Sequence, residues 1–313
     1  MYIGNGAYCY ANSASMLIKG IDENVSPSLL EVLSGVSLGV TLYGNGSLFL
    51  HNNIADPDVA ISNAMKILGF AFSEEISAED AECPLDQLRN VLKTSTAILG
   101  PVDMGYLTYS PNHRYAKGSD HYVLAYDMDD QYVYLHDPAG FPYVRLSLEN
   151  LKLAWKAKDI PYGRGPYQYW HSIKRINQPA DEEIYENSIR YFQQIYKETG
   201  KVGATIGAKT GTEAIASFCN KLENHEITEA AADNLKYFVF QLGAKRANDF
   251  SAYFEKRNPV LARLKRKQSE LLGLCHSLAV EEDWQNLSSV LRDFGKIEEE
   301  FEREILALEV YVS

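Results

Sequence analysis

The chain has 313 residues, of which 46% are hydrophobic and 23% are charged, so it is neither a disordered nor a fibrous protein. Its 30 Lys and Arg against 42 Asp and Glu give a net charge of −12. That excess of negative charge repels phosphate backbones and anionic lipid, which argues against binding to nucleic acid or a membrane surface. The length exceeds what one small core needs, so two domains are expected.

Cysteine is sparse in this chain and forms no Cys-x-x-Cys pair. The four cysteines are Cys9, Cys83, Cys219 and Cys275. This low density predicts reduced thiols in a cytoplasmic protein. The first residues lack the basic and apolar regions of a signal peptide, and the uncharged stretch 32–50 is too rich in Gly and polar residues to span a membrane. No cofactor is expected, and no metal site, because His113 and His121 lack the spacing of metal ligands.

The first part of the chain predicts helices followed by antiparallel strands. Caps and apolar spacing predict helices over 10–18, 56–68, 84–92 and 147–155. Runs of β-branched and aromatic residues predict strands over 96–102, 121–126, 131–136 and 143–146. Helices first and an antiparallel sheet later is the order of an α+β domain, in contrast to the alternation of a doubly wound sheet.

Composition changes near residue 178, since the residues up to this point hold 9 of the 11 prolines and 15 of the 21 tyrosines. Beyond it, apolar residues recur at intervals of three and four over 185–196, 261–278 and 287–308. This spacing in segments joined by short connections predicts an antiparallel helical bundle. We therefore expect an α+β domain over 1–176 and an all-α helical bundle over 177–313.

Residues 120–138 predict a β-hairpin that brings a histidine beside an aspartate. A three-residue turn at 128–130 would place His121 directly opposite Asp137 at the open end of the hairpin. Alternation of side chains puts both on the apolar face and His136 on the other face. A carboxylate in that place can fix the imidazole tautomer and stabilise the imidazolium; a purely structural hydrogen bond carries equal weight on the hairpin alone.

Cys9 follows a glycine-containing turn and directly precedes the first predicted helix. A thiol at a helix N-terminus faces the positive end of the helix dipole, which favours the thiolate. The alternative is a small buried apolar side chain, which fits the other three cysteines better. A cysteine at a helix start, a histidine at a strand start and an aspartate at a strand end together predict nucleophilic catalysis.

This constellation resembles the papain-like cysteine enzymes, and it is most similar to the branch that contains the N-terminal domain of the butirosin-biosynthesis protein H. The matching segments are 9–17 (C-Y-A-N-S-A-S-M-L), 31–49, 100–104, His121-Tyr122-Val123 with Asp137-Pro138, and 146–151. The resemblance covers roughly residues 1–160, so the helical tail lies outside it. It implies a papain-like fold, with an N-terminal helix and an antiparallel sheet, for the first domain.

The resemblance also implies a catalytic triad of Cys9, His121 and Asp137. In that family an acyl group passes from a carrier-protein thioester to an amine, and related peptidases use the same triad for hydrolysis. The partner would be an acyl carrier protein or a peptide. The alternative is a catalytically inactive module of the same fold that captures a peptide or a carrier protein.

The chain departs from the family pattern at two positions. Relatives commonly place Gly directly after the cysteine, where this chain has Tyr10, and the glutamine that binds the oxyanion lies six residues before it, where this chain has Ile3. Asn5 and the backbone N–H of Cys9 are therefore the candidate oxyanion donors.

Overall fold

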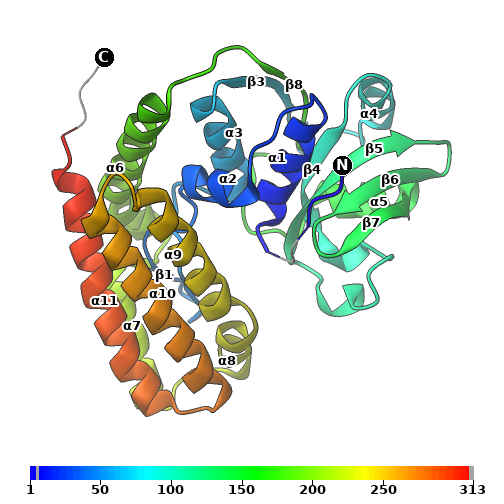
Figure 1. Cartoon of the computed structure of the whole chain (residues 1–313). Helices are drawn as coiled ribbons and strands as arrows, with labels where there is room; N and C mark the ends of the chain where they lie inside the picture. The colour runs from blue at the N-terminus through cyan, green and yellow to red at the C-terminus, as the bar shows by residue number, and fades with distance from the viewer. Residues whose placement is uncertain (5–6, 310–313) are drawn as a thin grey trace. The chain divides into compact units, whose positions relative to one another are not determined.

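The computed structural model describes residues 1–4 and 7–309, and the chain divides into two compact units. The first unit comprises Met1–Ser34 and Asp56–Pro179 and combines helices with an antiparallel sheet. The second comprises Gly35–Ala55 and the chain from Ala180 onward and is mainly helical (Figure 1). The predicted α+β class and the helical C-terminal region are confirmed, although helices and strands alternate more than the sequence predicted.

The first unit contains most of the strands. Its helices are α1 (Cys9–Lys19), α2 (Pro27–Ser34), α3 (Pro57–Ile67), α4 (Leu85–Leu92) and α5 (Leu148–Lys156), with the short turns η1 (Met104–Tyr106) and η2 (His113–Tyr115). Its strands are β3 (Phe70–Glu75), β4 (Ala97–Asp103), β5 (Asp120–Met128), β6 (Tyr132–Asp137), β7 (Phe141–Ser147) and β8 (Tyr169–Arg175). Within the described residues, these strands form one antiparallel sheet in the order β3-β8-β4-β5-β6-β7.

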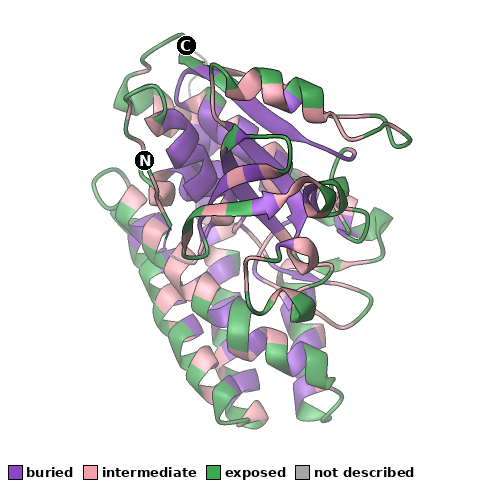
Figure 2. Cartoon of the chain, turned by 90° about the vertical axis from the view of Figure 1, so that its right-hand side faces the viewer, coloured by how far each residue is buried: buried purple, intermediate pink, exposed green. Residues whose placement is uncertain are grey.

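Helices cover both faces of this sheet. Alternate residues of β4, β5 and β6, such as Leu99, Val123 and Leu135, pack with side chains of α4 and α5, and all three are fully buried. On the other face, Tyr122 of β5 meets Tyr10 of α1 edge to face, and Trp170 of β8 donates a hydrogen bond to Ser62 of α3. The central strands are buried along most of their length (Figure 2). A sheet with two buried faces fits the nearly continuous apolar runs in these strands.

The β5–β6 hairpin has a different register from the predicted one. Its connection spans 129–131 instead of 128–130. Next to this connection, Asp127 of β5 pairs with Tyr134, which lies three residues beyond its predicted partner Gln131. A bulge between Ala125 and Asp127 takes back one residue, so that Ala125 pairs with Leu135, two residues from its predicted partner. The sequence alone did not reveal the bulge, which adds one unpaired residue to β5.

The net shift of two residues keeps every side chain beyond the bulge on its predicted face, because faces alternate with a period of two. The shift does change which residues of β5 and β6 lie directly opposite each other. Since Leu124 pairs with His136, the same register extended outward sets Val123 opposite Asp137 and leaves His121 diagonal to it. Diagonal neighbours on one face remain within reach of each other's side chains.

The second unit is a set of helices with a small sheet. Its helices are α6 (Asp181–Thr205), α7 (Gly211–Glu223), α8 (Glu229–Asn234), η3 (Leu235–Val239), α9 (Phe240–Phe254), α10 (Pro259–Val280) and α11 (Trp284–Ala307). Its strands are β1 (Thr41–Leu42), β2 (Leu48–Phe49) and β9 (Lys209–Thr210), paired in the order β2-β1-β9 within the described residues. Side chains of α7, α10 and α11 share one apolar core.

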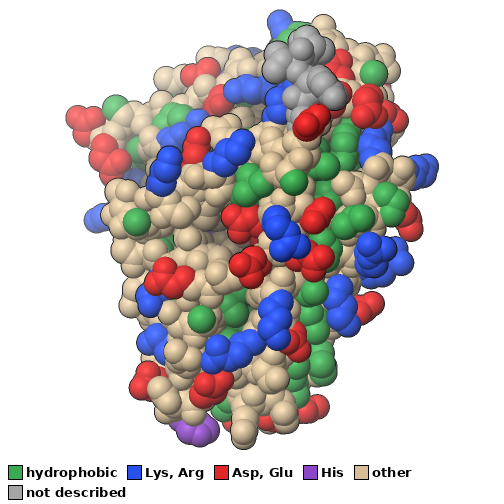
Figure 3. Space-filling model, turned by 90° about the vertical axis from the view of Figure 1, so that its left-hand side faces the viewer, with side chains coloured by type: hydrophobic (Ala, Val, Ile, Leu, Met, Phe, Trp, Pro, Cys, Tyr) green, Lys and Arg blue, Asp and Glu red, His purple; other side chains and the backbone are tan. Residues whose placement is uncertain are grey.

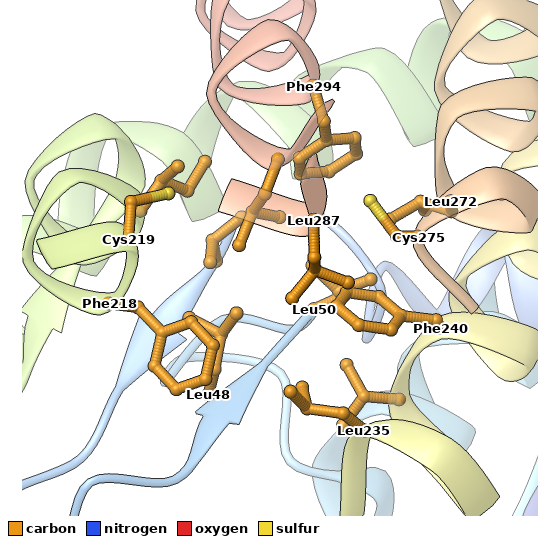
Figure 4. Close-up of a cluster of buried hydrophobic side chains, with 14 of the residues drawn as sticks. Leu48, Leu50, Phe218, Cys219, Leu235, Phe240, Leu272, Cys275, Leu287 and Phe294 are labelled. Carbon is orange, nitrogen blue, oxygen red and sulfur yellow. The ribbon is translucent and has the colours of Figure 1, made fainter. Parts of the chain in front are cut away.

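The expected first domain, 1–176, is not continuous in the structure, because Gly35–Ala55 belongs to the helical unit. Thr41 of β1 pairs with Thr210 of β9. Leu48 and Leu50 lie among apolar side chains of the helices, including Phe218 and Phe240 (Figure 4). Burial of these leucines and the backbone pairing of β1 hold Gly35–Ala55 in the second unit. The helices and β9 that it contacts are distant from it in the sequence.

Helix α10 carries a basic run, Arg263 to Lys267, and within it Lys265 is only 2% exposed. Its ammonium group lies 3.7 Å from the carboxylate of Glu298 and donates to Gln268 at 2.9 Å. Gln268 in turn donates to Glu298 at 2.7 Å, and Tyr196 does so at 2.8 Å. Paired and hydrogen-bonded in this way, a buried charge is tolerated.

On the face drawn in Figure 3, Lys and Arg side chains are interspersed with Asp and Glu. Exposed ion pairs such as Lys267–Glu270 and Lys296–Asp293 each contribute little to stability. None of the helices in the described part of the chain combines the length and the apolar character that crossing a membrane requires.

Candidate active site

Cys9 is the first residue of α1, as predicted, and is partly exposed. The chain enters the helix through Tyr8, whose φ of 58° lies in the left-handed region that a bulky side chain rarely adopts. The buried amide of Asn12 donates to the carbonyls of Ala7 and Tyr8, one turn before it. These bonds hold the strained turn and fix the direction in which Cys9 leaves it.

Helix α1 is fastened to the strand that carries His121. The hydroxyl of Ser13 donates to the backbone carbonyl of Tyr122 at 3.1 Å, and the ring of Tyr122 meets that of Tyr10 edge to face. A side chain at Gly100 on β4 would collide with the ring of Tyr122, so this position needs glycine. These contacts hold α1, which begins with Cys9, against β5, which carries His121.

His121 and Asp137 form a buried pair. The Nε2 atom of His121 lies 2.6 Å from Oδ1 of Asp137, and the two side chains are 7% and 2% exposed. Because Nε2 is occupied by the carboxylate, Nδ1 is the ring nitrogen left for a thiol. The predicted partners are therefore together, although His121 pairs across the sheet with Val102 of β4 and reaches Asp137 along the diagonal.

The electrostatics of the pair favour charge on both members. Burial lowers the pKa of His121, but attraction to Asp137 and the hydrogen bond with it, together with a further contribution from Cys9, outweigh the effect of burial and hold that pKa well above its ordinary value. Burial raises the pKa of the Asp137 carboxyl, yet the charge and hydrogen bond of His121, with those from Ala139 and Tyr109, lower it overall. The arrangement supports an imidazolium beside Cys9.

Three further groups hold Asp137 and its turn. The N–H of Ala139 donates to Oδ1 at 2.7 Å, and the hydroxyl of Tyr109 donates to Oδ2 at 2.8 Å. The hydroxyl of Tyr2 donates to the backbone carbonyl of Asp137 at 3.1 Å and accepts from the N–H of Gly140. The carboxylate thus accepts hydrogen bonds on both oxygens and the backbone of the turn is braced separately.

His136 lies on the opposite face of β6, as predicted. Its ring stacks on Tyr126 at a centroid distance of 4.7 Å and meets Tyr143 edge to face at 4.5 Å. Burial lowers its pKa, and its Nδ1 accepts from the backbone N–H of Tyr143. A neutral ring packed among tyrosines differs from His121 in both charge and surroundings.

The other residues considered in the sequence are the three remaining cysteines and Asn5. Cys219 and Cys275 are buried, and burial raises the pKa of both thiols, to about 12 for Cys275. Burial also raises the pKa of the partly buried Cys83 to about 12. Asn5 lies outside the described residues. Among the described residues, no group of three or more His, Cys, Asp and Glu is arranged to hold a metal ion.

The sequence analysis missed Asn12, Ser13 and Tyr109. Asn12 follows Tyr8 by four residues, the spacing of one helical turn, so a search for side chains that brace the helix start would have found it. Ser13 and Tyr109 act on partners more than twenty residues away. Neither carries a local pattern that predicts those contacts.

Fold and site define an α+β protein with a helical C-terminal unit and a buried His–Asp pair beside a cysteine at a helix start. The chain is 43% identical over 306 residues to "Uncharacterized protein YobF" of Bacillus subtilis (strain 168), an alignment that covers 98% of each chain. Residues 205–306 match the family described as the YobF C-terminal domain. The chain belongs to the YobF family.

Proposed function

We propose that the chain is a papain-like cysteine enzyme that uses Cys9, His121 and Asp137 to transfer an acyl group or to hydrolyse an amide or thioester. The observation that supports this most is the buried His121–Asp137 pair at 2.6 Å, with Cys9 close enough to contribute to the raised pKa of His121. A structural His–Asp bond alone would not need a thiol at a helix start near the imidazole.

In the proposed reaction, His121 takes the proton of the Cys9 thiol at Nδ1, and the thiolate attacks the acyl carbon of the donor. The backbone N–H of Cys9, one of the helix N–H groups without an intrahelical acceptor, binds the oxyanion. The bond to the leaving thiol or amine then breaks, and His121 returns the proton to that group. An amine or a water loses its proton to His121, attacks the acyl-cysteine and releases the Cys9 sulfur.

The role of Asp137 in this scheme is to keep Nδ1 available and to stabilise the imidazolium. An acyl carrier protein is the proposed donor partner, and a peptide is the donor if the reaction is hydrolysis. Asn5 stays a candidate second donor to the oxyanion.

The test is intact-mass spectrometry of the protein after incubation with a panel of acyl-carrier thioesters, with Cys9→Ala as the matched control. An adduct on Cys9 that is absent in the control is expected, and iodoacetamide at near-neutral pH should modify Cys9 before Cys83, Cys219 or Cys275. If no adduct forms and Cys9 is alkylated no faster than an ordinary thiol, the catalytic proposal is wrong. Carrier-protein binding without an adduct would then favour the inactive binding module.

A further inference from the structure

The connection between β4 and β5 is a loop closed at its base. The carboxylate of Asp103, which is 1% exposed, accepts from the N–H of Gly105 at 2.7 Å and from the N–H of Gly118 at 3.0 Å. The N–H of Met104 also donates to the carbonyl of Ser119 at 3.0 Å. These bonds join the two ends of the loop and hold what it carries in a fixed place.

What the loop carries to the site is Tyr109. Its hydroxyl donates to Oδ2 of Asp137 at 2.8 Å, and its ring packs against Phe141, with centroids 5.7 Å apart. Burial and the charge of Asp137 raise the pKa of Tyr109 well above its ordinary value. The phenol therefore stays protonated and remains a donor over the range in which an enzyme works.

Oδ2 is the oxygen of Asp137 that His121 does not use. His121 and the N–H of Ala139 both bind Oδ1, so Tyr109 supplies the hydrogen bond on the other oxygen of a carboxylate that is 2% exposed. A buried carboxylate oxygen without a donor is costly, and rotation of the carboxylate is the simplest way to relieve it. Such a rotation would move Oδ1 away from Nε2 of His121.

We propose that Tyr109 is a positioning residue that locks the Asp137 carboxylate in the orientation that supports His121, and so sets the reactivity of Cys9. This inference rests on the proposed function and adds a fourth side chain to the constellation. It also gives the β4–β5 loop a purpose, since the Asp103 bonds at its base determine where Tyr109 stands.

The test compares the pH dependence of Cys9 alkylation by iodoacetamide, followed by peptide mapping, in wild type, Tyr109→Phe and Tyr134→Phe. The control removes the same kind of hydrogen bond at the other end of the same hairpin, because the hydroxyl of Tyr134 donates to Oδ2 of Asp129 at 2.7 Å. Tyr109→Phe should lower the plateau rate about tenfold, the value of one hydrogen bond to a charged group. Its acid limb should move up by about one pH unit, because Asp137 loses a donor that lowers its pKa.

Tyr134→Phe should leave both the plateau and the acid limb as in wild type. A double-mutant cycle with Asp137→Asn separates positioning from general packing, since Tyr109→Phe should have no further effect when the carboxylate is already gone. Incorporation of 3-fluorotyrosine at position 109, a stronger donor of nearly the same shape, should move the acid limb the opposite way. This measurement keeps the proposal testable if Tyr109→Phe folds poorly.

The outcomes separate this inference from the proposed function. If wild-type Cys9 is no more reactive than an ordinary thiol, both are overturned. If wild-type Cys9 is activated but Tyr109→Phe has the wild-type profile, only the role of Tyr109 is overturned. The same holds if Tyr134→Phe shows the same loss, or if Tyr109→Phe loses as much in the Asp137→Asn background as alone.

Discussion

Replacement of Asp137 by Asn removes the charge of the buried pair and keeps its shape. The amide oxygen of Asn can still accept hydrogen bonds from Nε2 of His121 and the N–H of Ala139, so the fold of the turn is expected to survive. What is lost is the negative charge that holds His121 as an imidazolium. In the proposed mechanism this cation lies beside Cys9, so its loss should slow the alkylation of Cys9 at neutral pH.

The size of the effect follows from the distance and the burial. Two unit charges 2.6 Å apart attract each other by about 6 kcal/mol at an effective dielectric constant near 20. Both charges are spread over several atoms, so the expected loss is roughly 4 kcal/mol, which corresponds to about a thousandfold slower alkylation of Cys9 under the proposed mechanism. Side chains that are 7% and 2% exposed are screened weakly by salt, so the drop should persist at high ionic strength.

The pH dependence of stability carries the same information. Folding lowers the pKa of Asp137, so its contribution is present above the ordinary value of about 3.9 and is lost as the pH falls through the folded value. Folding raises the pKa of His121, so its contribution is complete below about 6.5 and is lost as the pH rises through the folded value. The stability difference between wild type and Asp137→Asn should therefore be largest between about pH 4 and 6.5.

The assay is the pH profile of Cys9 alkylation together with urea denaturation at several pH values. The matched control is His136→Asn, which changes the neighbouring residue on the opposite face and should cost only about 1 kcal/mol of stability. Cys9 reactivity that falls in the His136 variant and stays unchanged in Asp137→Asn would refute the reasoning. Some other group would then have to orient His121.

Two further predictions concern the helical unit. Proteolytic cleavage within 176–180 should leave the two fragments associated on native size exclusion, because Gly35–Ala55 pairs with β9 and packs in the helical core; elution of a free helical fragment would contradict this. Lys265→Met should lower the free energy of unfolding by about 3 kcal/mol in urea, because Glu298 is then buried without its cation. Lys267→Met, an exposed neighbour, should stay within about 0.5 kcal/mol, and an equal effect of both would refute the burial argument.

Much of the fold could be predicted from local chemistry in the sequence. The apolar spacing of the tail predicted its helices, and Asn258, a residue type that favours helix starts, caps α10 by accepting from the N–H of Leu261. Cys9 does begin α1, and the strand pattern placed His121 and Asp137 on one face. These features depend on helix caps and on periods of 3.6 and 2, which neighbouring residues determine by themselves.

The tertiary structure decided the features that depend on residues distant in sequence. The three-residue shift at the turn and the bulge after Ala125 together set the register of the β5–β6 hairpin. Because the net shift is two residues, an even number, His121 and Asp137 stay on the same face of the sheet. Gly35–Ala55 belongs to the second unit because it packs against the helices there. Lys265 can be buried because the carboxylate of Glu298 lies 3.7 Å from its ammonium group. Tyr109 reaches Asp137 from a loop 28 residues away. No local period encodes such contacts, since they form only where separate elements meet and exclude water.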